Sequence, residues 1–585
     1  MCGILLIYSK KKKLSKPLCE KTFNEIKNRG PDKFLKEYFE NDRLFIGNTI
    51  LSIVGKTKND NKLYKSKKSQ FKIAYNGEIY NYKKLANNIN AKTFNNDTEL
   101  LVNLFEHFSP NKIPNMLDGM FAFCVYDKNK KKIYFSSDVQ GERKLFIFND
   151  NKYFICSSNI KAIILFLKNN EINTKKLIEY FDTRHLIFYN KTIYKKIKYI
   201  MPGKIFNLDI KKDKIKRYTY DDPIKWIDQK KYKNFKNLGT NKLVNYFEKI
   251  IINTKNKMLP DVPFMSLFSG GIDSSLQSKY LDTSINLKGL LFVDHGKKDP
   301  ITKKIFKFKK YLTSKIYKIN MNEKDYAKDL KKTYKSLMMP FLTHDLVGIN
   351  KCFEFVKSKK CKVVFNAGGV DELFGGYKLY KNTNWNKNKI NLSPYSSYSN
   401  IYSKNIKTDY KDNSDRIWQR AFKKYSSFMN IKESKIQASL FTDYFVQAVG
   451  VHNISWHLLA GENSIEVRNF FINKDIIKEV INLPIKYKIN NKLKNNFSLK
   501  FLLKKIFSKN FNKNLVFKKQ GFSGFPNESS KYLNDLDKKS FDSLINKFKN
   551  KIKINRDNYW KILNIFYFKK FCVNKIKLSK FVNNF

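Results

Sequence analysis

The 585-residue sequence lacks the cysteine patterns that stabilise secreted or zinc-binding domains. Its seven cysteines are an odd number and include no CxxC pair, which argues against a disulfide framework and a zinc site. No uninterrupted apolar run reaches the ~18 residues that a membrane helix needs. The apolar stretch at the N-terminus precedes its lysines, the wrong order for a secretory signal. We therefore expect a protein of the reducing cytoplasm without a membrane partner.

Acidic residues are also scarce, with 51 Asp and Glu against 115 Lys and Arg, a formal net charge of +64. Such an excess normally suggests nucleic acid as a partner. Here the lysines are spread along the whole chain among Asn, Ile, Phe and Tyr, the residues that A/T-rich codons favour, and the densest run covers only residues 10–13. The charge is therefore interpreted as compositional bias, and nucleic acid is not expected as a partner.

The length and the 42% hydrophobic content predict two or three folded domains. Short apolar or alternating runs bounded by Gly, Asn or Asp predict strands, and apolar spacing predicts a helix over 97–108. The expected strands are residues 4–8, 71–75, 122–126, 133–136 and 153–157. Strands with few helices indicate an α+β domain of packed sheets over residues 2–205.

The pattern changes after residue 205. Residues 206–240 are polar and rich in Lys and Asp, and we interpret them as a linker. Over 241–530, a helix at 241–257 and strands at 264–268, 290–293 and 362–365 alternate with helices, which predicts a parallel sheet covered on both faces. Within this part, residues 385–430 look like a surface insertion or a mobile segment. Residues 531–585 form an expected helical extension.

The segment PFMSLFSGGIDSS, residues 263–275, predicts a phosphate-binding turn between a strand and a helix. Ser269, Gly270 and Gly271 let backbone N–H groups approach an anion, and the following helix adds the positive end of its dipole. The form differs from a Walker loop and resembles the SGGxDS signature of ATP pyrophosphatases, which split ATP between its α and β phosphates.

A second glycine cluster, NAGGVDELFGGY at residues 366–377, follows the predicted strand VVF. It should therefore reach the same carboxyl edge of the sheet, where ligands bind in open parallel sheets. Asp371 and Glu372 supply carboxylates of the kind that Mg²⁺ prefers. Further on, SIEVR at 464–468 and KKQGFS at 518–523 are expected to bring a carboxylate and cations to this edge.

Two interpretations of Cys2 are possible when the residue is considered alone. It is either a small buried thiol or, if Met1 is removed, a residue that carries a thiol and a free α-amine together.

Taken in order, the motifs resemble the glutamine-hydrolysing asparagine synthetases of the B type. The resemblance covers most of the chain, through MCGI, RGPD at 29–32, LSIV at 51–54, NGEIYN at 76–81, DTELL at 97–101, LDGMFAF at 117–123, SGGIDSS, DELFGGY, SIEVR and KKQGF. It implies a class II glutamine amidotransferase domain with the N-terminal-nucleophile fold, fused to an ATP-dependent synthetase domain of the ATP-pyrophosphatase type.

The resemblance also implies roles for particular residues. Cys2 would be the nucleophile that hydrolyses glutamine. Asn76 and Gly77 would form the oxyanion hole. Glu78 and Asp97 would bind the amino group of the substrate. ATP would be held at Leu267, Ser269, Gly270, Gly271, Asp273, Ser274, Phe292, Asn366 and Ala367. Asp273 and Asp371 would bind Mg²⁺, and Lys519 would stabilise the departing pyrophosphate. Released ammonia would pass internally to an adenylated carboxylate. A homodimer is left open.

Several positions depart from the family pattern. Ile50 replaces the arginine that binds the glutamine α-carboxylate, and Arg29 and Arg43 are candidates to take over that contact. Gly368 replaces the glutamate that takes part when ammonia meets the adenylate. The remaining changes are Ser137 for arginine, Lys144 for proline and Asn473 for a carboxylate.

Three functions are therefore weighed. The first is asparagine synthesis from aspartate. The second is amidation of another carboxylate, such as a sugar acid in surface-polysaccharide synthesis. The third is a non-catalytic nucleic-acid-binding or scaffold protein, against which intact Cys2, Asn76, Asp273 and Asp371 argue.

Overall fold

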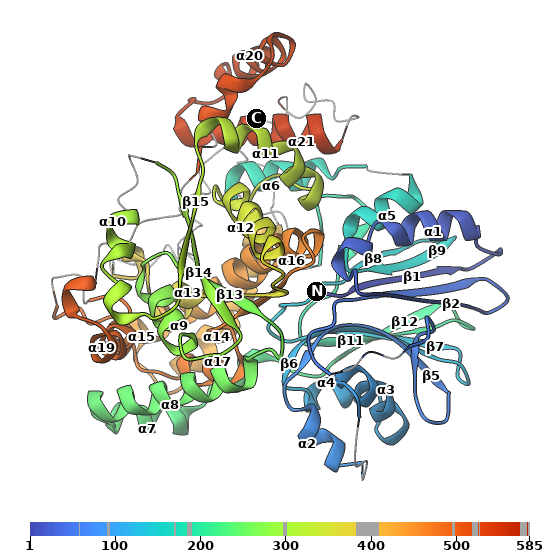
Figure 1. Ribbon diagram of the computed structural model, residues 1–585, viewed down its shortest axis with the longest axis horizontal. Helices are drawn as coiled ribbons and strands as arrows, with labels where there is room; N and C mark the ends of the chain where they lie inside the picture. Colours follow the sequence, from blue (N-terminus) through green and yellow to red (C-terminus); the bar gives the residue numbers. More distant parts are fainter. Residues whose placement is uncertain are drawn as a thin grey trace.

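The computed structural model describes residues 1–585 except 56, 58, 90–93, 169–170, 184–189, 297–300, 382–408, 494–497, 517–523, 526, 574–581 and 583–585. Two domains lie side by side, with the N-terminal one drawn in blue and the synthetase-like one in green to orange (Figure 1). No helix in the described part of the chain combines the length and apolar character needed to cross a lipid bilayer.

The N-terminal domain is a sandwich of two six-stranded sheets whose paired strands run antiparallel. One sheet has the order β10-β8-β9-β1-β3-β2, and the other β12-β11-β7-β6-β5-β4. The first sheet comprises β1 (Gly3–Ser9), β2 (Lys33–Phe39), β3 (Leu44–Ile50), β8 (Phe146–Asn149), β9 (Tyr153–Ser157) and β10 (Ile197–Tyr199). The second comprises β4 (Tyr64–Lys65), β5 (Phe71–Ile79), β6 (Gly119–Asp127), β7 (Lys132–Ser137), β11 (Lys204–Asp209) and β12 (Lys214–Thr219).

Strand β1 shows why the two sheets stack. Side chains alternate along a strand, so Ile4 and Leu6 enter the core between the sheets, while Leu5 and Ile7 enter a second core under helices. Those helices, α1 (Lys16–Asn24) and α5 (Ile160–Leu167), cover the outer face of the first sheet (Figure 1). The expected α+β sandwich is confirmed.

The predicted linker over 206–240 is wrong for most of its length. Strands β11 and β12 pair with each other, and β11 also pairs with β7, so the second sheet continues to residue 219. Every residue of β12 is exposed, and an edge strand of this kind lacks the apolar alternation that would reveal it in the sequence. Helix α7 (Gln229–Asn237) occupies another part of the segment.

The C-terminal domain is built on a five-stranded parallel sheet of order β15-β14-β13-β16-β17. Its strands are β13 (Phe264–Leu267), β14 (Leu287–Asp294), β15 (Ile316–Asn320), β16 (Val363–Asn366) and β17 (Glu466–Asn469). The order of the strands reverses between β13 and β16. In open parallel sheets a ligand binds at such a switch point, beyond the carboxyl ends of the strands.

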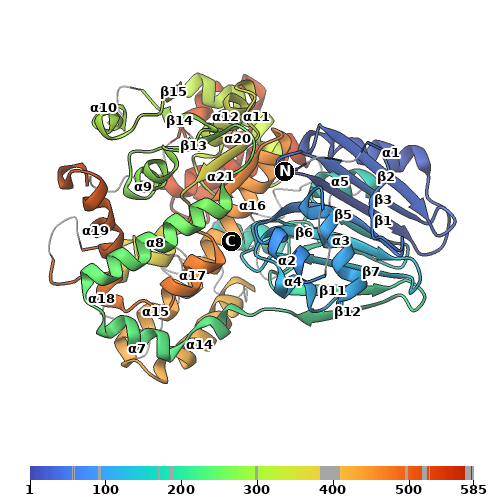
Figure 2. The same ribbon diagram turned by 60° about the horizontal axis from the view of Figure 1, so that its bottom comes forward.

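Helices cover both faces of this sheet, as the alternating pattern predicts. Helices α9 (Ile272–Leu281), α8 (Thr240–Met258) and α19 (Phe501–Asn510) pack together on one side, and α12 (Leu346–Ser358) and α16 (Asn453–Glu462) on the other (Figure 2). The remaining α-helices are α2 (Tyr82–Asn87), α3 (Asp97–His107), α4 (Ile113–Met116), α6 (Thr174–Thr183), α10 (Ile301–Phe306), α11 (Glu323–Leu337), α13 (Val370–Phe374), α14 (Asp409–Ser426), α15 (Ile431–Asp443), α17 (Lys474–Val480), α18 (Ile485–Lys488), α20 (Asp535–Lys549) and α21 (Arg556–Cys572).

Two further expectations concern the later part of the chain. Of the predicted insertion at 385–430, residues 382–408 lie outside the described part, but α14 packs on α15 and buries Trp418, so this half is part of the core. The expected helical extension contains α20 and α21, and α21 contacts both α11 and α6.

Candidate active sites

Cys2 lies at the start of β1, against the segment that follows β3. Its Sγ accepts a hydrogen bond from the Leu51 N–H at 3.4 Å and lies 3.9 Å from the Leu51 carbonyl. Its own carbonyl accepts from Arg29 Nε at 3.1 Å. The residue is therefore fixed by its backbone and its thiol, as a nucleophile requires.

With Met1 in place, the thiol is not activated. Burial raises the pKa of Cys2 to about 11, although the positive charge of the chain terminus and the Leu51 contact oppose the shift. Burial also lowers the pKa of the Met1 α-amine to about 5. Removal of Met1 would place an α-amine on Cys2 itself, beside the thiol that it must deprotonate.

Asn76 is a buried amide whose side-chain oxygen and nitrogen both lack a hydrogen-bond partner among the described residues. Such a group costs about 1–3 kcal/mol, so a native fold keeps it where a ligand can satisfy it. At the adjacent Gly77, a Cβ would come within 2.2 Å of the Met120 carbonyl, so only glycine fits. The pair has the chemistry of an oxyanion hole.

Asn48 joins the strand that follows Cys2 to the strand that contains Asn76, a link that no sequence motif indicates. Its Nδ2 donates to the Gly3 carbonyl at 2.8 Å and the Tyr75 carbonyl at 3.0 Å, and its Oδ1 accepts from the Tyr75 N–H at 3.0 Å. Gly3 follows Cys2 and Tyr75 precedes Asn76, so Asn48 joins the backbone beside Cys2 to the backbone beside Asn76.

Glu78 and Asp97, which are predicted to bind the substrate amino group, are both buried but differ in their contacts. Asp97 Oδ2 accepts from the Ile79 N–H and the Tyr75 hydroxyl, each at 3.0 Å. Burial raises the pKa of Asp97 to about 6 despite those hydrogen bonds. Glu78 Oε2 instead lies 2.9 Å from Arg468 Nη2, a residue of the other domain.

Neither Arg29 nor Arg43 is placed to bind the glutamine carboxylate in place of the arginine missing at Ile50. Arg29 is fully buried and donates to the carbonyls of Cys2 and His457. The Arg43 carbonyl accepts from the Ser9 N–H at the far end of β1, which is about 23 Å from Cys2 at about 3.3 Å per residue.

The turn after β13 has the predicted form of a phosphate loop. Gly270 has φ +66°, a left-handed conformation that favours glycine, and α9 begins directly after Gly271. Ser274 Oγ lies 3.0 Å from Ser269 Oγ and donates to the Gly271 carbonyl at 3.2 Å. These bonds hold the loop open at the switch point.

The predicted adenine contacts lie on the neighbouring strands at this edge. Leu267 is the last residue of β13, and it pairs with Leu291 on β14. Phe292 is the next residue of β14, so it lies one residue closer to the carboxyl edge of the sheet.

Lys500 stands between the two predicted metal ligands, and sequence reasoning missed it. It forms ion pairs with Asp371 Oδ1 at 2.7 Å and with Asp273 Oδ2 at 2.5 Å. The two carboxylates come from different glycine clusters and raise the pKa of this buried ammonium against the effect of burial. They already converge on one cation, so the pair fits the oxygen ligands that Mg²⁺ prefers.

Asn366 and Ala367 line the second glycine cluster beside Gly368. Asn366 Nδ2 donates to Asn469 Oδ1 at 2.9 Å, and it would lie 2.8 Å from a Cβ added at Gly368. Asn469 in turn donates to Glu142 Oε2 at 3.0 Å. Burial and nearby Asp138 raise the pKa of Glu142 to about 8. A carboxyl group of the N-terminal domain therefore reaches the edge of the second site.

The prediction that SIEVR brings its charged side chains to the carboxyl edge of the parallel sheet is wrong. Glu466 and Arg468 do not face the phosphate loop, because β17 begins at Glu466 and points these side chains toward the N-terminal domain. Arg468 Nε lies 2.9 Å from Glu466 Oε1, and Arg143 Nη2 lies 3.4 Å from Glu466 Oε2. Lys519 and the rest of 517–523 lie outside the described residues.

Comparison with known proteins agrees with this arrangement. A glutamine amidotransferase domain profile matches residues 1–220, and the asparagine synthase profile matches residues 251–552, more than half of the chain. Asparagine synthetase [glutamine-hydrolyzing] 1 of Bacillus subtilis is 30% identical over 410 residues, which are 65% of this chain and 60% of that protein. Asparagine synthetase [glutamine-hydrolyzing] of Mus musculus is 25% identical over 404 residues, 64% of this chain and 67% of that protein. The chain belongs to the asparagine synthase family and carries a glutamine amidotransferase domain ahead of its synthase domain.

Proposed function

We propose that this protein transfers the amide nitrogen of glutamine to an ATP-activated carboxylate, with aspartate as the acceptor and asparagine as the product. The observation that carries the proposal is the buried amide of Asn76, which has no hydrogen-bond partner among the described residues, on a strand that Asn48 ties to the backbone beside Cys2. The names of the relatives support aspartate.

In the first half-reaction, the Cys2 thiolate attacks the amide carbon of glutamine, and the proton passes through the freed α-amine to the departing ammonia. Asn76 and the Gly77 N–H stabilise the negative charge that develops on the carbonyl oxygen. Water then hydrolyses the thioester and releases glutamate. Asp97 binds the substrate ammonium, and Glu78 assists if it separates from Arg468.

In the second half-reaction, the acceptor carboxylate attacks the α phosphate of ATP and pyrophosphate leaves. The loop Ser269–Gly271 and the start of α9 bind the phosphates. Asp273 and Asp371 would hold Mg²⁺, which when bound neutralises part of the triphosphate charge. Ammonia then attacks the acyl carbon and AMP leaves.

Strand β17 supports an internal route for ammonia. Its residue Arg468 contacts Glu78 beside the first site, and the next residue, Asn469, contacts Asn366 at the second. Adjacent residues of one strand thus touch both sites, and their side chains point to opposite faces.

A different acceptor carboxylate is the second candidate. Gly368 and Asn366 together favour it, because the family glutamate is absent and Asn366 lies where its side chain would start.

The first test is glutamine hydrolysis by the purified protein. Cys2→Ala should abolish glutamate release, and Asn76→Ala should lower kcat by about 10²–10³-fold. Cys19→Ala is the matched control, since Cys19 is also a buried thiol near the N-terminus and should leave the rate unchanged. Undiminished hydrolysis by Cys2→Ala would exclude the assignment.

The second test measures pyrophosphate release with ATP, Mg²⁺ and ammonium while the acceptor is varied. Stimulation by aspartate supports asparagine synthesis. Stimulation by a uronic acid but not by aspartate would replace it with the second candidate.

A further inference from the structure

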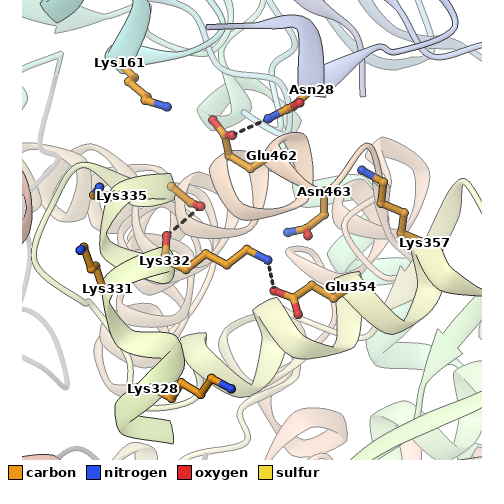
Figure 3. Close-up of a pocket in the computed structure, with 11 residues that line it drawn as sticks. Asn28, Lys161, Lys328, Lys331, Lys332, Lys335, Glu354, Lys357, Glu462 and Asn463 are labelled. Carbon is orange, nitrogen blue, oxygen red and sulfur yellow. Dashed lines mark hydrogen bonds and ion pairs between the residues drawn. The ribbon is translucent and has the colours of Figure 1, made fainter. Parts of the chain in front are cut away.

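A cavity of about 640 Å³ opens where helices of the synthase domain meet the amidotransferase domain, away from both sites described above (Figure 3). Helices α11, α12 and α16 form most of its wall, and Asn28, which follows α1, and Lys161 of α5 complete it. It is lined by Asn28, Lys161, Lys328, Lys331, Lys332, Lys335, Ser336, Glu354, Lys357, Glu462 and Asn463.

The lining holds six lysines against two glutamates, a formal excess of four positive charges. Both glutamates are already engaged. Glu354 pairs with Lys332 at 2.6 Å, and Glu462 accepts hydrogen bonds from Asn159 and Asn28 of the amidotransferase domain at 2.8 and 3.4 Å. The two glutamates carry two negative charges, so they offset at most two of the six lysines in the lining.

Lys161 has its own carboxylate, Glu25, at 2.8 Å. By contrast, Lys328, Lys331 and Lys335 form no ion pair with any described residue, and Lys357 Nζ donates to the Ser464 hydroxyl at 3.4 Å. Like charges that share a cavity repel one another, and this repulsion is relieved when an anion enters.

The helix geometry of α11 gathers these charges on one side. Lys328, Lys331 and Lys335 are spaced i, i+3 and i+7, so they share a face, while Leu330 and Tyr334 are buried on another. A solvated helix face alone would have the same spacing. Here, however, the lysine face looks across a hollow at a wall from the other domain (Figure 3).

The chemistry of the lining restricts the ligand. It contains no aromatic side chain on which a nucleobase could stack and no arginine for bidentate recognition. Lysines select a ligand by its charge rather than by its shape, because each ammonium is a point charge on a flexible side chain. The volume falls in the range of about 300–1,000 Å³ that is typical of small-ligand sites.

We propose that this cavity binds a compact inorganic or organic polyphosphate, held by Lys328, Lys331, Lys335 and Lys357. The ligand would lie between the two domains and stabilise their contact. This site is separate from the phosphate loop after β13 and does not depend on the proposed function.

The experiment is calorimetric titration of the full-length protein with inorganic tripolyphosphate at low salt. Because the phosphate loop also binds such an anion, the wild type should show two sites. The variant K328Q/K331Q/K335Q should lose one of them or weaken it at least tenfold. The control K242Q/K249Q/K255Q removes the same charge from α8, and it should keep both sites.

Unfolding temperatures separate binding from misfolding. Without ligand, the α11 variant should unfold at the same or a higher temperature than the wild type, because repulsion is removed. Tripolyphosphate should raise the unfolding temperature of the wild type and the control more than that of the α11 variant.

Three results would overturn the proposal. The α11 variant could retain both sites, or the α8 control could lose as much affinity, which would indicate general attraction to a +64 protein. Alternatively, single-stranded DNA could displace tripolyphosphate at the α11 site and bind more tightly, which would make nucleic acid the partner.

Discussion

Arg468 of the synthase domain lies 2.9 Å from Glu78 of the amidotransferase domain, and both side chains are buried. The same guanidinium is bound by Glu466, which also faces Arg143. A pair that joins the two domains beside the candidate nucleophile links their stabilities, because neither charge can be left alone in the interior.

Arg468→Gln should therefore destabilise the protein by about 3–5 kcal/mol, the usual cost of breaking a buried pair. The double variant Glu78→Gln/Arg468→Gln should recover part of that loss, since it leaves one uncompensated carboxylate fewer. Both values come from urea denaturation. Arg420→Gln is the control, because its ion pair with Asp222 is 58% exposed on the arginine side and should contribute about 0–1 kcal/mol. Equal losses at Arg468 and Arg420 would contradict the buried role.

Lys500 occupies the position between Asp273 and Asp371 that a divalent cation would take. In Lys500→Gln the two carboxylates lose their counter-charge, so the unfolding temperature should fall, and millimolar Mg²⁺ should restore it more than it stabilises the wild type. Differential scanning fluorimetry over a Mg²⁺ series measures this.

The control for that series is Lys488→Gln. Lys488 is also buried, but it donates to the Gln437 amide at 2.8 Å rather than to carboxylates. Its loss should lower stability without rescue by Mg²⁺. Rescue of both variants, or of neither, would count against a cation site at Asp273 and Asp371.

If Asp97 binds the substrate ammonium as proposed, glutamine binding should depend on pH. Its pKa is raised to about 6, so the carboxylate charge that attracts the substrate ammonium is present above this pH and is lost as the pH falls through it. The KM for glutamine should therefore fall as the pH rises from 5 to 7. Asp97→Asn should show a high KM that does not change over this range. A wild-type KM without this dependence would remove Asp97 from the binding site.

The pair Asn366 and Gly368 tests the acceptor. In Gly368→Glu alone, the new Cβ would lie 2.8 Å from Asn366 Nδ2 and disturb its bond to Asn469, so activity should not improve. In Asn366→Ser/Gly368→Glu the obstruction is removed and the family residues return. If aspartate is the acceptor, aspartate-stimulated pyrophosphate release should rise above that of the wild type. An unchanged rate would favour another carboxylate.

Much of the fold could be predicted from the sequence. Strands β1, β5 and β13 are apolar runs between turn residues, and the glycine clusters predict the turns that follow the strands of the parallel sheet. Strand β12 could not, since it has no buried residue. The site was predictable where its chemistry is local, as in SGGIDSS. Asn48 and Lys500 were not predicted and Arg468 was assigned to the wrong site, because their partners are far away in the sequence and only the packing of strands and domains brings them together.

In the proposed function, nitrogen released at Cys2 reaches the carboxylate activated in the other domain. The most direct measurement incubates the protein with amide-¹⁵N glutamine, ATP, Mg²⁺ and aspartate, and analyses the product by mass spectrometry. We expect ¹⁵N-asparagine from the wild type, and from Cys2→Ala only when ¹⁵N-ammonium replaces glutamine. Labelled asparagine formed from glutamine by Cys2→Ala, or none formed by the wild type, would contradict it.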